Sequence, residues 1–334
     1  MDRSGSASLD VVVPLYNEEA MIEVLTAELS RTFSAEALQR HRISRIRFVM
    51  VDDGSRDKTA QALSAKIADG FPAVLIRLSR NFGHQNAVCA GLDFADADLV
   101  AVIDADLQDP PELILNMADR WRDGFEVVYA ERRKRKGSVF KRICYWGFYR
   151  VVAVLSDISI PLDSGDFCLM DRCVVQALRS MPENLRFVRG LRAWVGFRQT
   201  GVPYDRPERR AGTTKYSLGK LYKLATDGIA SFSIRPLKVA QVLSFSYFIL
   251  TAAIVAFLVG GWLLGMQFSI PPLTLITFLL IVSGNGALCL CVYILGAYVG
   301  RSYLEVKRRP PYLIHETIGA PKTADHAGNP GNSR

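Results

Sequence analysis

In the first third of the chain, an apolar run, 99–103, is followed directly by side chains that carry oxygen at every second position. They are Asp104, Asp106 and Gln108. In an extended segment alternate side chains project to one side, so these oxygens can converge on one hard cation. Mg²⁺ or Mn²⁺ held by one or two carboxylates usually shares its coordination shell with a substrate diphosphate. The alternative is that the acids only cap the helix that the following prolines would open.

Short apolar runs that alternate with segments of helical spacing are expected to position these acids. Such a pattern predicts βαβ units, hence an α/β fold with a mostly parallel sheet and helices on both faces. The expected strands are 9–14, 47–52, 73–78, 99–103 and 126–130, and the expected helices are 21–38, 59–68, 83–95 and 111–123. In such sheets ligands bind at the carboxyl ends of the strands, which is where the acids lie.

Polar residues also follow the earlier strands of the expected sheet. Glu18 follows the first strand, and Asp52 and Asp53 end the second, so each could accept a hydrogen bond from a base or a ribose hydroxyl. The alternative for Asp53 and Ser55 is that one of them caps the next helix. The segment 80–85 after the third strand adds amide and cationic donors beside the same crevice.

The last third of the chain contains a long block, 239–300, without a single Asp, Glu, Lys, Arg or His. Two apolar runs within it, 243–264 and 273–298, each exceed the roughly 20 residues that a membrane-spanning helix needs. A buried helix pair of a soluble protein is the alternative. We therefore expect a soluble domain over 1–235, two transmembrane helices within 236–309, and a cytoplasmic tail, 310–334, that is disordered from 321 onward.

Basic residues flank both apolar runs, whereas the loop between the runs carries no charge. By the positive-inside rule both ends lie in the cytoplasm, which predicts a multi-pass protein of the cell inner (plasma) membrane whose large soluble domain is cytoplasmic. Small residues that could pack helices of a homo-oligomer are Gly284, Gly286, Gly296 and Gly300. The net charge of +8 suits an anionic membrane surface or phosphorylated substrates, and no nucleic-acid-binding motif is present.

Two further basic segments could contact phosphates. The segment 131–142 precedes an aromatic-rich amphipathic stretch, 144–155, which could lie in the membrane interface. The segment 204–217 reads as a loop whose cations could close over a diphosphate. For both segments the alternative is ordinary solvated charge.

Four stretches together carry a family resemblance: 11–19 (VVVPLYNEE), 51–55 (VDDGS), 78–83 (LSRNFG) and 104–112 (DADLQDPPE). In this order and spacing they resemble family 2 glycosyltransferases. More narrowly they resemble the polyprenyl-phosphate glycosyltransferases, the group of dolichol-phosphate mannose synthase and of bacterial undecaprenyl-phosphate glucosyl- and aminoarabinosyltransferases. The resemblance extends through the apolar block to about Arg309 and implies a GT-A fold.

The resemblance also implies roles for individual residues. The residues expected around the donor nucleotide are Pro14, Tyr16, Glu18, Asp53, Arg209 and Lys215. Those expected to hold the metal and the diphosphate are Asp104, Asp106 and Gln108. Candidates for gripping the acceptor phosphate are Arg132, Lys141 and Arg142. Asp166 is expected to be a catalytic carboxylate on the acceptor side, where it would act either as a base or as a positioning group. A phosphomonoester with a second pKa near ~6 is already deprotonated at neutral pH, which favours positioning.

The expected reaction is inverting transfer of one hexose from a nucleotide diphosphate sugar to a polyprenyl phosphate at the cytoplasmic membrane face. UDP-glucose is the first expected donor, and GDP-mannose and UDP-aminoarabinose are the alternatives. A processive polysaccharide synthase is disfavoured because the segment 186–197 lacks the Gln-x-x-Arg-Trp motif of those enzymes. A membrane scaffold with an inactive transferase domain is disfavoured by the intact acids at 104 and 106.

Overall fold

The computed structural model describes residues 3, 5–132, 164–183, 186–205, 235–264 and 270–319. The chain divides into two units, which we describe separately. The first comprises 1–146, 158–216 and 309–334, and the second comprises 147–157 and 217–308.

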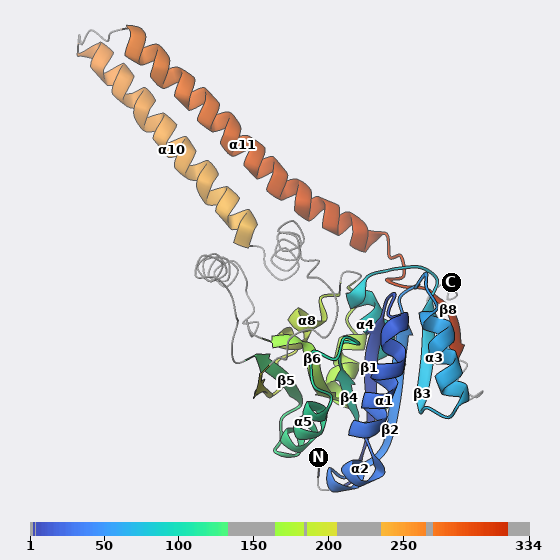
Figure 1. The fold of residues 1–334 in the computed structure, drawn as a ribbon. Coiled ribbons are helices and arrows are strands. Elements are labelled where there is room, and N and C mark those ends of the chain that lie inside the picture. Colours follow the sequence, from blue (N-terminus) through green and yellow to red (C-terminus); the bar gives the residue numbers. More distant parts are fainter. Residues whose placement is uncertain are drawn as a thin grey trace, which may run out of the picture. The chain divides into compact units, whose positions relative to one another are not determined.

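The first unit is built on an eight-stranded mixed sheet of order β7-β5-β6-β4-β1-β2-β3-β8 (Figure 1). The strands are β1 (Ala7–Leu15), β2 (Ile43–Asp52), β3 (Ala73–Leu78), β4 (Leu99–Val102), β5 (Val127–Arg132), β6 (Ser164–Asp171), β7 (Gln199–Tyr204) and β8 (Ile314–Ile318). Strands β4, β1, β2 and β3 run parallel, β6 is antiparallel to both β4 and β5, and β7 is parallel to β5. The expected α/β class with a mostly parallel sheet is confirmed.

Helices cover this sheet, and those expected over 59–68, 83–95 and 111–123 lie where the apolar spacing predicts them. The described helices are α1 (Ile22–Thr32), α2 (Ala35–Arg40), α3 (Thr59–Ala68), α4 (His84–Phe94), α5 (Glu112–Arg122), α7 (Arg172–Arg179) and α8 (Val188–Trp194), with a 3-10 turn, η1 (Glu19–Met21), before α1. Helix α4 packs directly on β1, since a Cβ at Gly91 would lie 2.3 Å from Val12 Cγ1. The single helix expected over 21–38 is wrong: it breaks at Phe33, and the Ser34 side chain accepts from Ala37 N to begin α2.

Strand β8 was not expected, because it comes from the segment 310–334 that the sequence suggested to be a tail. It pairs antiparallel with β3 at the edge of the sheet, where Arg77 forms an ion pair with Glu316. Just before β8, the Tyr312 hydroxyl donates to Asp93 Oδ2 at 2.7 Å. The chain therefore returns to the sheet after the apolar block. The residues 321–334, expected to be disordered, lie outside the described residues.

The second unit contains two long helices, α10 (Arg235–Leu263) and α11 (Ile270–Val306) (Figure 1). By length and composition both could cross a membrane, over Leu237–Gly261 and Thr277–Val306, with mean hydropathies of 2.4 and 2.2. These segments overlap the expected spans 243–264 and 273–298. The helices contact each other where the Tyr247 hydroxyl donates to the carbonyl oxygen of Leu280.

One of the glycines proposed for helix packing has a partner within the chain. A Cβ at Gly284 would lie 2.6 Å from the Tyr247 hydroxyl oxygen, so this glycine lets α10 and α11 approach each other. For Gly286, Gly296 and Gly300, no atom of the described residues would lie within 4 Å of an added Cβ. The homo-oligomer stays a prediction.

Candidate active site

The carboxyl ends of β1, β2 and β4 meet at one edge of the sheet. Leu15 lies opposite Asp52 in the β1–β2 register, and Asp53 N–H donates to the Leu15 carbonyl at 2.9 Å. On the other side of β1, Ile103 N–H donates to the Val12 carbonyl at 3.0 Å. The segments that follow these three strands therefore start beside one another, as the parallel pairing requires.

Asp53 joins the turns that follow β2 and β3. Its buried carboxylate accepts from Phe82 N–H at 2.7 Å and from Gly83 N–H at 2.9 Å. Burial raises the pKa of Asp53 above its ordinary value, although these two backbone hydrogen bonds oppose the shift. Gly54 has φ +67°, and a Cβ there would lie 2.4 Å from the carbonyl carbon of Arg80, so the two turns are in direct contact.

The helix-capping alternative for Asp53 and Ser55 is wrong. Helix α3 begins only at Thr59, and the side chain that accepts from Thr59 N–H is Asp57, at 3.0 Å, rather than Asp53 or Ser55. Ser55 Oγ instead accepts from Asn17 N–H at 2.9 Å, which ties the turn after β2 to the turn after β1. In the turn after β1, Tyr16 is exposed and Glu18 N–H donates to Thr59 Oγ1. Pro14 is buried within β1.

The residues after β4 form a tight turn, so the extended segment expected over 104–108 is wrong, as is the helix cap. Asp106 Oδ1 accepts from Gln108 N–H at 3.1 Å, and Leu107 between them has φ +51°. Helix α5 begins at Glu112 without a side-chain cap, so the capping alternative for Asp104 and Asp106 is also wrong. The Asp104 side chain is 38% exposed, whereas Gln108 is buried.

Asp166, from a distant part of the chain, reaches the same place through strand pairing. Strand β6 is antiparallel to β4 with Val102 opposite Cys168, and continuing this register by two residues brings Asp104 opposite Asp166. His84 lies between the two acids: its Nε2 is 3.7 Å from Asp104 Oδ1 and 3.4 Å from Asp166 Oδ2. The structure thus brings together a predicted metal ligand and the predicted acceptor-side acid.

Side chains hold the Asp166 carboxylate. Gln85 Nε2 donates to Asp166 Oδ2 at 3.0 Å, while Gln85 Oε1 accepts from Val188 N–H at 3.0 Å. Arg189 Nη2 lies 3.4 Å from Asp166 Oδ1. Gln85 therefore links the start of α4 to both β6 and the start of α8.

The charges of this cluster move the pKa values of its members in opposite directions. Burial alone would raise the pKa of Asp166, but the hydrogen bond with His84 and the charge of Arg189 outweigh it and hold the pKa below its ordinary range. Burial raises the pKa of Asp104, and the nearby Asp166 adds to the rise. Asp166 is therefore ionised at neutral pH and is a weak base, which suits a positioning role.

The donor set fits a divalent cation that is shared with a substrate. Carboxylate oxygens from Asp104 and Asp106 are hard ligands, and the clustered negative charge around Asp104 would be relieved by a cation. Among the described residues no three His, Cys, Asp or Glu side chains form a ready metal cluster. A site of one or two carboxylates completed by substrate phosphates and water agrees with this arrangement.

Several predicted phosphate-binding residues lie outside this description. Lys141, Arg142, Arg209 and Lys215 are not among the described residues, and Arg132 is described only as the last residue of β5. Conversely, sequence reasoning did not assign His84, Gln85 or Arg189 to Asp166. The position of 80–85 after a strand indicated donors near the crevice, but no sequence signal connected 84, 85 and 189 with 166.

Comparisons with known proteins agree with the family resemblance. Residues 10–179 match the model of the family described as glycosyl transferase family 2. An uncharacterized glycosyltransferase of Synechocystis sp. is 42% identical over 93% of this chain and 96% of the relative. A prophage bactoprenol glucosyl transferase homolog of Escherichia coli is 36% identical over 92% and 98%, and a prophage-derived bactoprenol glucosyl transferase of Shigella flexneri is 35% identical over 96% and 99%. Together with the sheet described above, the family match confirms the GT-A class.

Proposed function

Because the chain belongs to glycosyltransferase family 2, we propose that it transfers a single hexose from a nucleotide diphosphate sugar to a polyprenyl phosphate. UDP-glucose is the proposed donor, because similar proteins from Escherichia coli and Shigella flexneri are named as a bactoprenol glucosyl transferase homolog and a bactoprenol glucosyl transferase. GDP-mannose and UDP-aminoarabinose remain the alternative donors.

The observation that carries this proposal is the meeting of two acids from separate segments. Asp104, at the end of the central strands, and Asp166, on β6, both lie within 4 Å of the His84 ring. A transfer between two phosphorylated substrates needs the leaving diphosphate and the attacking phosphate close to one carbon atom. Asp104 would serve the first substrate and Asp166 the second.

In the proposed reaction an oxygen of the acceptor phosphate forms a bond to C1 of the sugar while the bond from C1 to the diphosphate breaks. Attack from the face opposite the leaving group inverts the anomeric configuration. Asp104, Asp106 and Gln108 are the proposed ligands of Mg²⁺ or Mn²⁺, which would neutralise negative charge that grows on the leaving diphosphate. Pro14, Tyr16, Glu18 and Asp53 would surround the nucleoside.

The acceptor phosphate needs little help to become a nucleophile. Its second pKa near ~6 leaves it mostly deprotonated at neutral pH. Asp166, itself ionised, would orient the acceptor rather than remove a proton. The basic candidates outside the described residues would add to binding, with Arg132, Lys141 and Arg142 on the acceptor and Arg209 and Lys215 on the donor diphosphate.

A lipid acceptor agrees with the composition of the second unit. Helices α10 and α11 are long and apolar enough to cross a bilayer, and basic residues flank them on both outer ends. We propose that the catalytic domain is cytoplasmic and that the enzyme acts on the cytoplasmic face of the inner membrane as a homo-oligomer.

A donor panel tests the proposed function. The purified full chain is incubated with undecaprenyl phosphate, a divalent cation, and radiolabelled UDP-glucose, GDP-mannose or UDP-aminoarabinose in separate reactions. We expect label from UDP-glucose to enter the organic phase as one sugar per lipid. A long labelled polymer would instead indicate a processive synthase. Absence of transfer from all donors would contradict the proposal.

A further inference from the structure

We propose that Arg189 binds the phosphate group of the lipid acceptor. This inference rests on the proposed function and adds a phosphate-binding residue within the described part of the site. It follows from the position of the guanidinium, from a buried donor without an acceptor, and from the balance of charge around Asp166.

Arg189 places a positive charge beside the acceptor-side acid. It belongs to the short helix α8, and its Nη2 lies 3.4 Å from Asp166 Oδ1. Its side chain is 27% exposed, so a ligand can reach it, and the guanidinium carbon lies 5.8 Å from the centre of the Phe187 ring. The guanidinium is thus supported by an aromatic ring and remains partly open to solvent.

Part of the hydrogen-bonding capacity of this guanidinium is unused among the described residues. An arginine side chain carries five N–H donors, and within the described residues its Nε is buried without a hydrogen-bond partner. A buried donor that lacks an acceptor is unfavourable, and hydrogen bonding to a bound anion would relieve that cost. Phosphate oxygens suit this purpose because arginine can bind two of them with parallel hydrogen bonds.

The charges of the site favour a cation at this position. Asp104, Asp106 and Asp166 are all negative when ionised, and a phosphomonoester brings a further charge of about −1.5 to −2. Without a nearby positive group, that phosphate would be repelled from Asp166. Arg192 on the same helix is 1% exposed, and its guanidinium lies 5.4 Å from the Tyr129 ring centre, so it cannot offer its charge to a ligand as Arg189 can.

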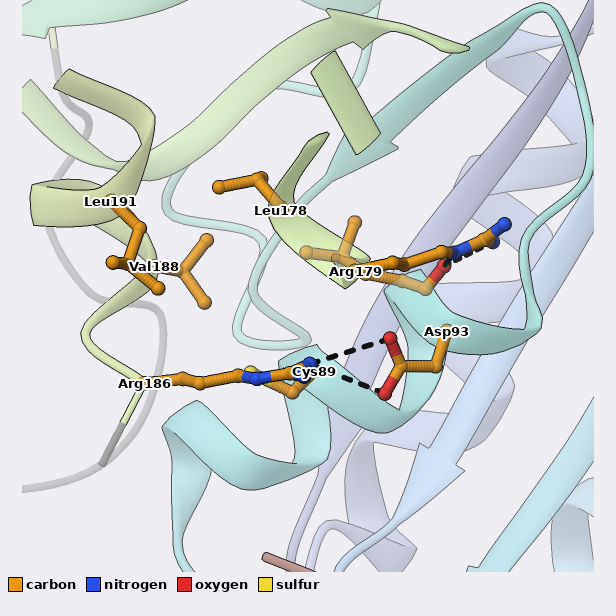
Figure 2. A pocket seen from close by; sticks show the side chains of 8 residues that line it. Cys89, Asp93, Leu178, Arg179, Arg186, Val188 and Leu191 are labelled. Atoms are coloured by element: carbon orange, nitrogen blue, oxygen red, sulfur yellow. Dashed lines mark hydrogen bonds and ion pairs between the residues drawn. The ribbon is translucent and has the colours of Figure 1, made fainter. Parts of the chain in front are cut away.

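The backbone of α8 is fixed by contacts that do not involve the Arg189 side chain. Arg186, just before the helix, lies 3.4 Å from each oxygen of Asp93, as Figure 2 shows. These two residues border a cavity of about 10 Å³, which has room for no more than one water molecule. Val188 N–H donates to Gln85. Replacement of the Arg189 side chain should therefore leave the helix in place.

The test measures the transfer kinetics of variants of the purified full chain. Undecaprenyl phosphate is varied at saturating UDP-glucose in one series, and UDP-glucose is varied at saturating undecaprenyl phosphate in the other. For Arg189→Ala we expect the KM for undecaprenyl phosphate to rise at least tenfold, while the KM for UDP-glucose stays within twofold. Arg189→Lys should recover part of the loss, since it keeps the charge but not the paired donors. Arg198→Ala is the matched control, because it removes an exposed arginine that stacks on Phe125 elsewhere in the same unit.

The outcomes separate this inference from the proposed function. If wild type forms glucosyl lipid and Arg189→Ala keeps the acceptor KM, the inference is wrong and the function stands. A fall in kcat alone would show that Arg189 only orients Asp166, which also overturns it. If wild type forms no glucosyl lipid, both the function and the inference fail. Thermal unfolding of each variant reports folding, and Arg189→Lys provides the kinetic comparison if Arg189→Ala does not fold.

Discussion

Two of the acids proposed for the donor side, Asp53 and Asp106, are held by different kinds of groups from Asp166, the acid proposed for the acceptor side. Asp53 accepts from the backbone N–H groups of Phe82 and Gly83, and Asp106 accepts from the backbone N–H of Gln108. Asp166 is instead held by the side chains of three residues: His84, Gln85 and Arg189. One side is positioned by turn geometry and the other by long-range side-chain contacts.

This difference determines how each side responds to change. A carboxylate held by backbone N–H groups keeps its position as long as the turn forms, whichever side chains surround it. A carboxylate held by side chains depends on the identity and the charge of each partner. We therefore expect backbone strain to disturb the proposed donor side most. Single side-chain substitutions or a change of pH should disturb the proposed acceptor side most.

The largest expected effect comes from strain in the turn after β2. Gly54→Ala places a Cβ 2.4 Å from the Arg80 carbonyl carbon at a residue with φ +67°. We expect a loss of about 3 kcal/mol in the free energy of unfolding, and at least tenfold weaker donor binding, since the turns that hold Asp53 must separate. Denaturant unfolding and UDP-glucose titration measure the two quantities.

A matched control separates steric contact from backbone conformation. Gly70 has φ +95°, but an added Cβ would have no atom of the described residues within 4 Å. Gly70→Ala should therefore cost only about 1 kcal/mol and leave donor binding intact. Equal effects of the two substitutions would show that contact between the turns does not position the donor side.

An intermediate effect is expected from substitution of Gln85, whose side chain links α4 to β6 and α8. Gln85→Leu removes the hydrogen bonds to Asp166 and Val188, each worth about 1 kcal/mol. We expect kcat for transfer to fall about 10- to 100-fold, with donor affinity unchanged, because only the acceptor side loses its alignment. Initial rates and donor titration provide the measurement.

Gln85→Glu sharpens this prediction, because the carboxylate can still accept from Val188 N–H but is repelled by Asp166. Its kcat should fall at least as far as that of Gln85→Leu. Normal transfer by Gln85→Glu would mean that the hydrogen bond to Asp166 has no part in the reaction.

The smallest expected effect is a pH dependence of stability on the acceptor side. Burial lowers the pKa of His84, but its hydrogen bond with Asp166 and the charge of Asp104 raise it further, so the net shift is upward. The resulting stabilisation is complete below the unfolded value near ~6.5 and is lost as the pH rises through the raised pKa. Since the side chain is 44% exposed, the contribution should stay below about 1 kcal/mol.

Unfolding of wild type and His84→Gln, compared at pH 6 and pH 9 with a chelator present, measures this contribution. The destabilisation by His84→Gln should be larger at pH 6. A difference that is larger at pH 9 would show that His84 is not stabilised in its charged form by the two acids.

The places in the fold of the acids proposed for the donor side could be predicted well from the sequence. Apolar runs mark β4, most of β1 and β3, and the second half of β2, because strand segments covered on both faces are mainly apolar. Asp53 and Asp104 follow the carboxyl ends of β2 and β4. The capping alternatives could not be decided in advance. Ser and Asp fit both a turn and a helix start, and only the position of Thr59 and Glu112 as first helical residues distinguishes the two.

The acceptor side could be predicted only in part. The resemblance indicated Asp166, but its position opposite Asp104 depends on the antiparallel register of β4 and β6, which local sequence does not specify. Arg189 lies 23 residues from Asp166, and neither hydrophobic spacing nor turn chemistry connects the two. Strand β8 was not predicted for the same reason, because its partner β3 lies far away in the sequence.

The most direct test of the account is the binding of UDP-glucose to the purified full chain with and without Mn²⁺, measured for wild type, Asp106→Ala and the control Asp123→Ala, which removes an exposed acid from the end of α5. We predict that Mn²⁺ strengthens binding to wild type and to Asp123→Ala at least tenfold and has no effect on Asp106→Ala. Equal affinity in all three proteins, whether or not Mn²⁺ is present, would contradict a cation site at the end of β4.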